Sequence, residues 1–468
     1  MIKKLAIVGG GLALLVALLS TTSVGSYATT AISRIRHRVD DSVPVKFKLD
    51  DAKEQLARIA PEINQMKYEF ARQELQVKRL HEEVLASESA LDDQLANIVR
   101  LKSHLESGDT VFVSRGRNYS IEQVELAAPR ADEVLVRIVG TGMCHTDVLP
   151  RGEITLSPPP IITGHEGAGV VEAVGDEVTG IAVGDHVVLS FESCGACAMC
   201  AAGRPASCET FLMRNLLGRN VDFTTGVTDA DGNEVASRWF GQSSFATHAI
   251  ATARNTIVVD KALPLEKLGP LGCGILTGAG TVLVALDVQP GASVAVFGTG
   301  AVGLAAVMAA VVAGAETIVA VDLHDHRLEL ARELGATHTV RGDVANVVGE
   351  IHDITGGGAH HTVDTTGVPS VMQAALGALR LGGSCGYVGV QQGDLVLDAL
   401  ALVGKTVVGV LEGNADPQVL IPRLIDLWQQ GRFPFDRLIE TFPLSQIDEA
   451  EQASLRGDVV KPVLVPGA

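Results

Sequence analysis

The chain of 468 residues is 47% hydrophobic and 20% charged, which supports two or three domains with sizeable cores and excludes a disordered protein. Its formal net charge of −18 argues against nucleic acid or an anionic membrane surface as the partner of the folded part. Fifty glycines predict many tight turns and close backbone approaches, and the spacing of the seven cysteines is typical of metal ligation by reduced thiols.

Residues 1–35 have the pattern of a targeting segment. Lys3 and Lys4 precede an apolar run over 5–19, the length of a signal-peptide core. Residues 20–32 are uncharged and mostly small, so a tilted helix over 5–32 could also cross a bilayer. A cleaved signal peptide and a retained signal anchor therefore both stay open. The basic residues that follow favour a membrane anchor with the folded part facing the cytoplasm: Arg34, Arg36, Arg38, Lys46 and Lys48.

Residues 36–108 contain a heptad repeat. All eight a positions are apolar, and so are four of the seven d positions, which predicts a long coiled-coil helix and hence a homo-oligomer. A single amphipathic helix that lies on the folded part is the alternative. The a positions are Leu56, Ile63, Phe70, Val77, Val84, Leu91, Ile98 and Leu105.

Residues 109–274 change to short strands separated by Gly and Pro, as in an antiparallel barrel; the strands are expected over 111–113, 121–126 and 133–139. Cys144 follows the last of these strands, and His165 lies twenty-one residues later in Gly164-His165-Glu166-Gly167. A Cys-His pair alone fits a buried thiol beside a core histidine. Together with Cys273, however, it supplies the two-sulfur, one-nitrogen set that leaves a tetrahedral zinc with one open position.

A second cysteine group is more compact. Its spacing is Cys194-x2-Cys197-x2-Cys200-x7-Cys208, which can wrap one zinc as a closed tetrathiolate site. Disulfides and an iron-sulfur cluster are the competing interpretations. Because the thiols must stay reduced, this group also favours the cytoplasmic side. Cys385 is left over and is expected to be a small buried apolar residue.

Residues 275–412 have the pattern of a dinucleotide-binding domain. A buried strand over 293–297 leads into Gly298-x-Gly300-x-x-Gly303 and a helix over 304–313, and a second strand ends in Asp322. The glycines let the backbone approach a pyrophosphate at the helix N-terminus. Asp322 would accept hydrogen bonds from the adenosine ribose and repel a 2′-phosphate, so NAD is expected over NADP. His324, His326 and Arg327 add positive charge nearby and weaken that preference. Residues 413–468 are expected to return to the first domain.

From Tyr119 to the end, these motifs resemble the zinc-dependent medium-chain alcohol dehydrogenases, whose ligand set is the Cys2His set described above. The chain looks most like the NAD-dependent aryl-alcohol (benzyl-alcohol) dehydrogenases in three segments, 194–197, 240–247 and 271–278. The resemblance implies an α/β protein in which a GroES-like antiparallel barrel domain (109–274) is joined to a Rossmann doubly wound parallel sheet (275–412).

The resemblance also implies roles for individual residues. Cys144, His165 and Cys273 would hold the catalytic zinc, with Glu166 behind the metal and Asp147 bonded to the far nitrogen of His165. Thr146 would hydrogen-bond the substrate oxygen, and His145 would approach the NAD pyrophosphate. Thr277 and Val302 would pack against the nicotinamide. Cys194, Cys197, Cys200 and Cys208 would hold the structural zinc. The remaining residues expected to bind the cofactor are Gly298, Gly300, Gly303, Asp322 and Arg327.

Two departures from the family stand out. Leu149 occupies the position where liver-type enzymes have a proton-relay histidine, and Thr110–Ser114 must serve as the first strand of the catalytic domain. The expected reaction is oxidation of a primary, aryl-type alcohol to the aldehyde, with hydride transfer to NAD. The alternatives are an aliphatic alcohol or a glutathione-formaldehyde adduct as substrate, or a membrane-tethered scaffold with an inert dehydrogenase part. Both cysteine sets disfavour a zinc-free quinone reductase.

Overall fold

The computed structural model describes residues 111–114, 117–120, 124–152, 155–157 and 159–467. The expected anchor (1–35) and coiled coil (36–108) lie outside these residues. Within the part of the chain that is described, no helix combines the length and apolar character needed to span a bilayer.

Strands β1 (Val111–Ser114) and β2 (Arg117–Ser120) form an antiparallel hairpin in a unit of its own, residues 1–121. In the described residues of this unit β1 pairs with β2, and the expectation that 110–114 acts as the first strand of the catalytic domain stays a prediction. Of the strand expected over 121–126, the described residues contain only β3 (Glu125–Leu126), which pairs with β7 (Val227–Thr228).

The catalytic domain is built on a seven-stranded sheet in which β4 is the central strand. Alternate residues of β4, such as Val134, Val136 and Ile138, are buried in a shared core, as the period of two in a strand requires. The sheet order is β16-β17-β4-β5-β6-β9, and β8 also pairs with β4. The strands are β4 (Glu133–Gly142), β5 (Gly167–Val174), β6 (His186–Leu189), β8 (His248–Thr252), β9 (Thr256–Val259), β16 (Ile439–Pro443) and β17 (Lys461–Val465).

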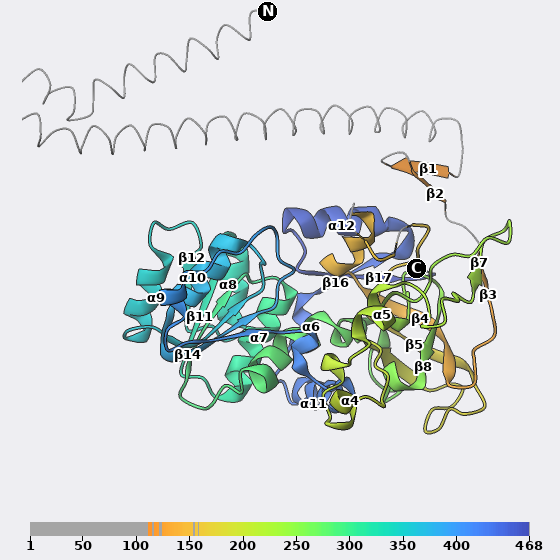
Figure 1. The fold of residues 1–468 in the computed structure, drawn as a ribbon, viewed down its shortest axis with the longest axis horizontal. Helices are drawn as coiled ribbons and strands as arrows, with labels where there is room; N and C mark the ends of the chain where they lie inside the picture. Colours follow the sequence, from red (N-terminus) through yellow and green to blue (C-terminus); the bar gives the residue numbers. More distant parts are fainter. Residues whose placement is uncertain (1–110, 115–116, 121–123, 153–154, 158, 468) are drawn as a thin grey trace, which may run out of the picture. The chain divides into compact units, whose positions relative to one another are not determined.

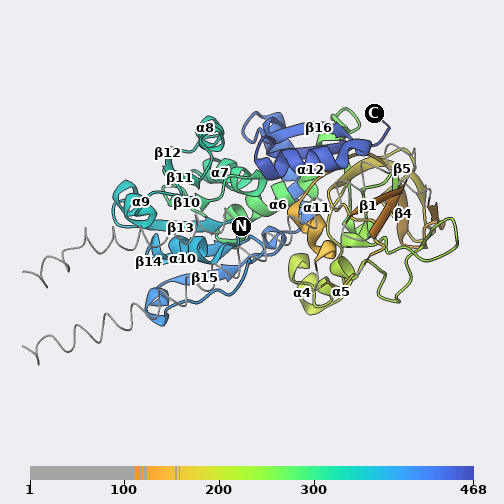
Figure 2. The same cartoon turned by 90° about the horizontal axis from the view of Figure 1, so that it is seen from above.

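The second sheet is parallel, with the order β12-β11-β10-β13-β14-β15 (Figures 1 and 2). This is the predicted Rossmann sheet. Its strands are β10 (Ser293–Phe297), β11 (Thr317–Asp322), β12 (His338–Arg341), β13 (Ala359–Asp364), β14 (Leu379–Tyr387) and β15 (Thr406–Gly409).

Helices cover both faces of this parallel sheet. Val294 and Val296 of β10 share a core with α7 (Ala301–Ala313) and α8 (Asp325–Glu333). The alternating residues Ala295 and Phe297 face a second core, which includes residues of α9 (Val347–Thr355) and α10 (Pro369–Gly377). All residues of β10 are therefore buried, which explains its continuous apolar sequence.

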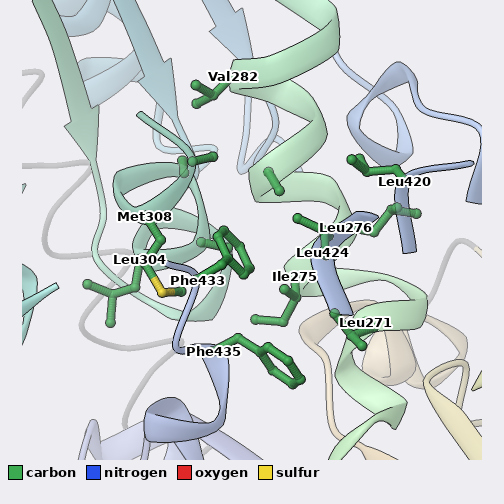
Figure 3. Packing of buried hydrophobic residues seen from close by; sticks show 14 of the residues in the cluster. Leu271, Ile275, Leu276, Val282, Leu304, Met308, Leu420, Leu424, Phe433 and Phe435 are labelled. Atoms are coloured by element: carbon green, nitrogen blue, oxygen red, sulfur yellow. The ribbon is translucent and has the colours of Figure 1, made fainter. Parts of the chain in front are cut away.

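Helix α6 (Gly274–Gly280) connects the two domains and continues as a π-helical turn, Thr281–Ala285. In Figure 3 its Ile275 and Leu276 lie among Leu304 and Met308 of α7 and Leu424 of α11 (Pro417–Gln429). This burial fixes the helix that begins next to Cys273. The remaining helices are α4 (Ala198–Ala201), α5 (Phe211–Leu216), α11 (Pro417–Gln429) and α12 (Ile447–Arg456).

Candidate active site

Cys144, His165 and Cys273 meet at one point although they come from distant segments. Cys144 precedes the 3-10 helix η1 (His145–Arg151) at the end of β4, His165 precedes β5, and Cys273 precedes α6. Their ligand atoms, with a carboxylate oxygen of Glu166, all lie within 4.8 Å of one another. Because the Glu166 carboxylate forms an ion pair with Lys461, the two sulfurs and the imidazole form the three-ligand set of a catalytic zinc site.

The side chain of His165 is oriented by Asp147. Its Nδ1 lies 2.6 Å from the Asp147 carboxylate, which also accepts hydrogen bonds from the backbone N–H groups of Gly164 and Cys144. Burial alone would lower the pKa of His165, but the charge and hydrogen bond of Asp147 outweigh burial and raise it well above its usual value. The opposite nitrogen, Nε2, is buried and has no hydrogen-bond partner in the described residues. An unpartnered buried nitrogen beside two thiols fits a metal ion.

The thiols of Cys144 and Cys273 have pKa values that are shifted in opposite directions before a metal binds. The pKa of Cys144 is well below its usual value because Cys273 hydrogen-bonds to it, with His165 contributing further. The pKa of Cys273 is raised by that same hydrogen bond and by burial. Zinc binding requires both as thiolates, so loading the site releases protons.

Glu166 is buried behind this group and pairs with Lys461 of β17. The Lys461 ammonium donates to Oε1 of Glu166 at 2.7 Å and to the Met143 carbonyl at 2.9 Å, and the backbone N–H of Gly274 donates to Oε1 at 2.9 Å. Burial raises the pKa of Glu166 to about 7, and the Lys461 charge opposes this rise. Gly142 leaves room for the carboxylate, because a Cβ there would lie 2.0 Å from Glu166 Oε2.

The four clustered cysteines form a separate site. Cys194, Cys197, Cys200 and Cys208 are free thiols whose sulfur atoms all lie within 4.8 Å of one another. The Sγ atoms of Cys194 and Cys200 are 3.9 Å apart, close to the separation of about 3.8 Å that tetrahedral Zn–S bonds of about 2.3 Å require. Backbone N–H groups of residues 194, 196, 197 and 200 donate to these sulfurs. The arrangement fits a structural zinc and contradicts disulfides, whose sulfur atoms are about 2.05 Å apart.

The glycine-rich turn has the geometry of a dinucleotide site. Gly298 adopts φ +86°, and a Cβ on Gly303 would lie 1.8 Å from the Gly298 carbonyl, so both glycines are required for the turn. A Cβ on Gly300 would meet no atom within 4 Å, so this position leaves space for a ligand to approach the backbone. Asp322 Oδ2 accepts hydrogen bonds from the N–H and hydroxyl of Thr299, so it also fixes the turn.

The structure brings several other expected residues toward this region. A Cβ on Gly278 would lie 2.1 Å from the Val302 carbonyl, so α6 and α7 approach closely and bring Thr277 near Val302. The Thr146 hydroxyl lies 3.8 Å from Cys144 Sγ. His145 is exposed at the start of η1. Arg327 lies on α8, where its guanidinium faces Gly457 at the end of α12.

Three residues at the site were missed by the sequence analysis. Lys461 could have been found, because a lysine inside the apolar run 459–465 signals a buried acidic partner. Phe240, at φ +51°, stacks on the His165 ring with centroids 4.4 Å apart. Glu412 is 5% exposed and contacts Cys273 and Thr277. Phe240 lies in segment 240–247, which carries part of the family resemblance, but nothing in that segment indicates its stacking on His165, and no sequence motif marks Glu412.

A largely antiparallel seven-stranded sheet, in which only the pairing of β16 with β17 is parallel, is joined to a Rossmann sheet. Together with the Cys2His cluster, these two sheets define a metal-dependent, dinucleotide-binding oxidoreductase. Comparison with known proteins agrees. A family model described as "Alcohol dehydrogenase GroES-like domain" matches residues 130–261, and one described as "Zinc-binding dehydrogenase" matches residues 301–429. The geraniol dehydrogenase of Castellaniella defragrans is 45% identical over 355 residues, which are 75% of this chain and 95% of the relative.

Two solved structures are similar over the same part of the chain. An alcohol dehydrogenase zinc-binding domain protein from Burkholderia ambifaria is 48% identical, with a TM-score of 0.73, over 76% of this chain and 97% of that protein. The benzyl alcohol dehydrogenase of Acinetobacter calcoaceticus is 42% identical, with a TM-score of 0.71, over 74% and 94%. The chain belongs to the zinc-dependent medium-chain alcohol dehydrogenase family, whose members use NAD together with a catalytic and a structural zinc.

Proposed function

We propose that this enzyme oxidises a primary alcohol whose hydroxyl-bearing carbon is attached to an aromatic ring or a C=C bond. Geraniol and benzyl alcohol, the substrates named for two similar proteins, share this chemistry. When bound, zinc polarises the substrate hydroxyl as a Lewis acid and NAD accepts the hydride. The observation that carries the proposal is the convergence of Cys144, His165 and Cys273 around the unpartnered nitrogen of His165.

The residues of the chain would bind and orient the reactants. Thr146, whose hydroxyl is next to Cys144, would accept a hydrogen bond from the substrate hydroxyl and pass its own proton to the cofactor ribose or to water as it takes the substrate proton. Leu149, which is 38% exposed, replaces the relay histidine, so we assign no second proton carrier to η1. Asp147 holds the tautomer of His165 that leaves Nε2 free for the metal.

For the cofactor, we assign NAD binding to the turn Gly298–Gly303, with Asp322 facing the adenosine ribose and Arg327 close by. Open space at Gly300 supports this assignment. Thr277 and Val302 would contact the nicotinamide, and exposed His145 would contact the pyrophosphate. The Asp322 carboxylate already accepts hydrogen bonds from the backbone N–H groups of Thr299 and His324, and a bond from the ribose would add to these.

The test is Cys144→Ser in the full chain, with Cys385→Ser as the control because Cys385 is buried far from either thiol cluster in sequence and belongs to neither. Cys144→Ser should abolish turnover and leave NAD binding largely intact, whereas Cys385→Ser should keep both. Near-normal turnover by Cys144→Ser would contradict the ligand assignment.

Specificity constants for benzyl alcohol, geraniol, a linear saturated alcohol and the glutathione-formaldehyde adduct would test the substrate class. We expect the first two to be preferred, and a preference for the linear alcohol or the adduct would overturn the assignment. NADH production from none of the four, despite bound zinc and NAD, would instead favour the inert scaffold.

We further propose that residues 1–35 tether the enzyme to a membrane with the catalytic part in the cytoplasm, and that residues 36–108 assemble it as a homo-oligomer through the coiled coil. The basic residues after the apolar segment and the reduced thiols support the orientation. Alkaline extraction and protease protection of full-length protein in cells test the tether, and light scattering tests assembly. Complete release from membranes, or a monomeric mass, would overturn the respective proposal.

A further inference from the structure

Glu412 is a buried acid that none of the roles above uses. It begins the 3-10 turn η9 (Glu412–Asn414), which connects β15 to α11, and it is 5% exposed. One carboxylate oxygen lies 3.6 Å from the Sγ of Cys273, and the other accepts a hydrogen bond from the Thr277 hydroxyl at 3.3 Å. The side chain therefore reaches both a zinc ligand and a residue assigned to the nicotinamide.

The backbone of this turn is held in an uncommon conformation. Glu412, Gly413 and Asn414 have φ values of +50°, +65° and +52°, in the left-handed region that residues with a side chain rarely adopt. Strain of this kind persists only where the surrounding structure imposes it, and it is concentrated at functional sites.

Close contact with α6 imposes this left-handed backbone conformation on residues 412–414. A Cβ on Gly413 would lie 2.7 Å from the Cα of Gly280 and 2.9 Å from the Leu276 carbonyl. The two backbones can approach this closely only because both Gly280 and Gly413 lack a side chain. The approach brings the Glu412 carboxylate to the first turn of α6.

Cys273 and Thr277 are one helical turn apart. The Thr277 N–H donates to the Cys273 carbonyl at 2.7 Å, so their side chains lie on the same face, where one carboxylate can bridge them. A carboxylate is a costly group to bury for packing alone, and an apolar residue would fill the space at lower cost. Neither hydrogen-bond contact of Glu412 in the described residues is a cation, so an ion pair does not explain it either.

We propose that Glu412 is a positioning residue that holds the Cys273 sulfur and the Thr277 hydroxyl at a fixed separation. With Cys273 bound to zinc as a thiolate, the proton of this contact would stay on Glu412, which would donate it to the sulfur while its other oxygen accepts from Thr277. The bridge would fix the metal ligand relative to the residue assigned to the nicotinamide, so that the metal meets the substrate oxygen and the nicotinamide meets the carbon that bears it. The inference rests on the proposed function, because it assigns Cys273 to the metal and Thr277 to the cofactor.

Two conservative variants separate the effect of side-chain length at position 412 from the effect of the carboxyl group. Glu412→Gln keeps the length of the side chain, with an oxygen that can accept from Thr277 and an N–H that can donate to the Cys273 sulfur, whereas Glu412→Asp keeps the carboxyl group but is too short to bridge both partners. Asn414→Gly is the control, because it alters the same turn and glycine readily adopts φ +52°.

The measurements use the zinc-loaded full chain. They are the rate of catalytic-zinc release to a chromogenic chelator, the sulfur-to-cobalt absorption of the Co²⁺-substituted site, and the dissociation constant of NAD⁺. Glu412→Asp should release zinc about tenfold faster, shift the cobalt absorption and weaken NAD⁺ binding several-fold, since residues that support metal ligands contribute about 10–100-fold to affinity. Glu412→Gln and Asn414→Gly should stay close to the unmodified enzyme.

Zinc release and NAD⁺ binding by Glu412→Asp that match the unmodified enzyme would overturn the proposal. So would a Glu412→Gln variant as impaired as Glu412→Asp, because Glu412→Gln keeps the length of the side chain and the length could then not explain the loss. Failure of the proposed function is distinguishable, since it would appear as Cys144→Ser keeping its turnover, whatever the Glu412 variants do.

Discussion

Glu166 and Lys461 form a buried ion pair although they are 295 residues apart, with side-chain exposures of 0% and 3%. Glu166 follows the zinc ligand His165 directly, and Lys461 also bonds to the carbonyl of Met143, the residue before Cys144. Strand β17 pairs with the end of β4 and places Lys461 there. The C-terminal segment therefore closes the metal site from behind.

Replacing Lys461 with methionine should lower the free energy of unfolding by about 3–5 kcal/mol, because it leaves the Glu166 carboxylate buried without a cation. Urea denaturation of the zinc-loaded protein measures the change. Lys261→Met is the control, since Lys261 pairs with Asp185 at the surface and should cost less than about 1 kcal/mol. Equal decreases in the free energy of unfolding of the two variants would show that the buried ion pair contributes no more to stability than the surface pair.

Asp147→Asn should weaken zinc binding at the catalytic site by about 10–100-fold, because the charge that orients and polarises His165 is lost while the shape of the side chain is retained. Competition with a chelator of known affinity measures this. Asp185→Asn removes a carboxylate from a surface turn and should leave zinc affinity unchanged. A competition curve for Asp147→Asn that superimposes on the control would contradict the role assigned to Asp147.

Gly300→Ala and Gly303→Ala should fail in different ways. A Cβ added at position 303 would collide with the Gly298 carbonyl, so the second variant should lose about 1–3 kcal/mol of stability. A Cβ added at position 300 would meet no protein atom within 4 Å, so the first variant should keep its stability within about 0.5 kcal/mol. It should still bind NAD about tenfold more weakly or worse, because one charge-assisted hydrogen bond to a phosphate is worth about 1.5–3 kcal/mol. Unfolding curves and NAD titrations of both variants check this pair, and unimpaired NAD binding by Gly300→Ala would refute the assigned pyrophosphate contact.

Cys197→Ser should lose the structural zinc, keep the catalytic zinc and unfold at a lower temperature. The reason is that a closed tetrathiolate site contributes its binding energy to the folding of the loop that carries it. Metal analysis and thermal denaturation test this, with Cys385→Ser as the buried-cysteine control that should retain both ions. Loss of both ions from Cys197→Ser would mean that the two sites are not independent.

Local patterns predicted most of the fold. The alternation in β4 and the continuous apolar run of β10 follow from burial on one face and on both faces of a sheet, so each strand could be found from its own residues. The strand expected over 133–139 is longer, because Gly140 and Thr141 also pair with β5, and Thr141 and Gly142 pair with β17. Strand β17 lies more than 300 residues away, so no local pattern contains that pairing.

The residues of the site also divide into those that local sequence indicates and those whose partners are distant in the chain. Cysteines and glycines at fixed spacings, such as Cys197 and Gly300, carry a signal because metal ligation and close backbone approach restrict the residue type. The residue types of Phe240 and Glu412 do not indicate their contacts with His165 and Cys273, because those contacts form only after folding. The pairing of β1 with β2 was missed for a similar reason, since a short apolar strand does not specify its neighbour.

The position of Lys461 on the last strand also bears on how the enzyme matures. During synthesis, Cys144 and His165 leave the ribosome long before Cys273, and the counter-charge for Glu166 arrives only with the final residues of the chain. All three metal ligands are therefore synthesised before the lysine that neutralises the carboxylate behind them. We expect a product that ends before β17 to hold zinc poorly at this site, because the Glu166 carboxylate would then be left without its cation.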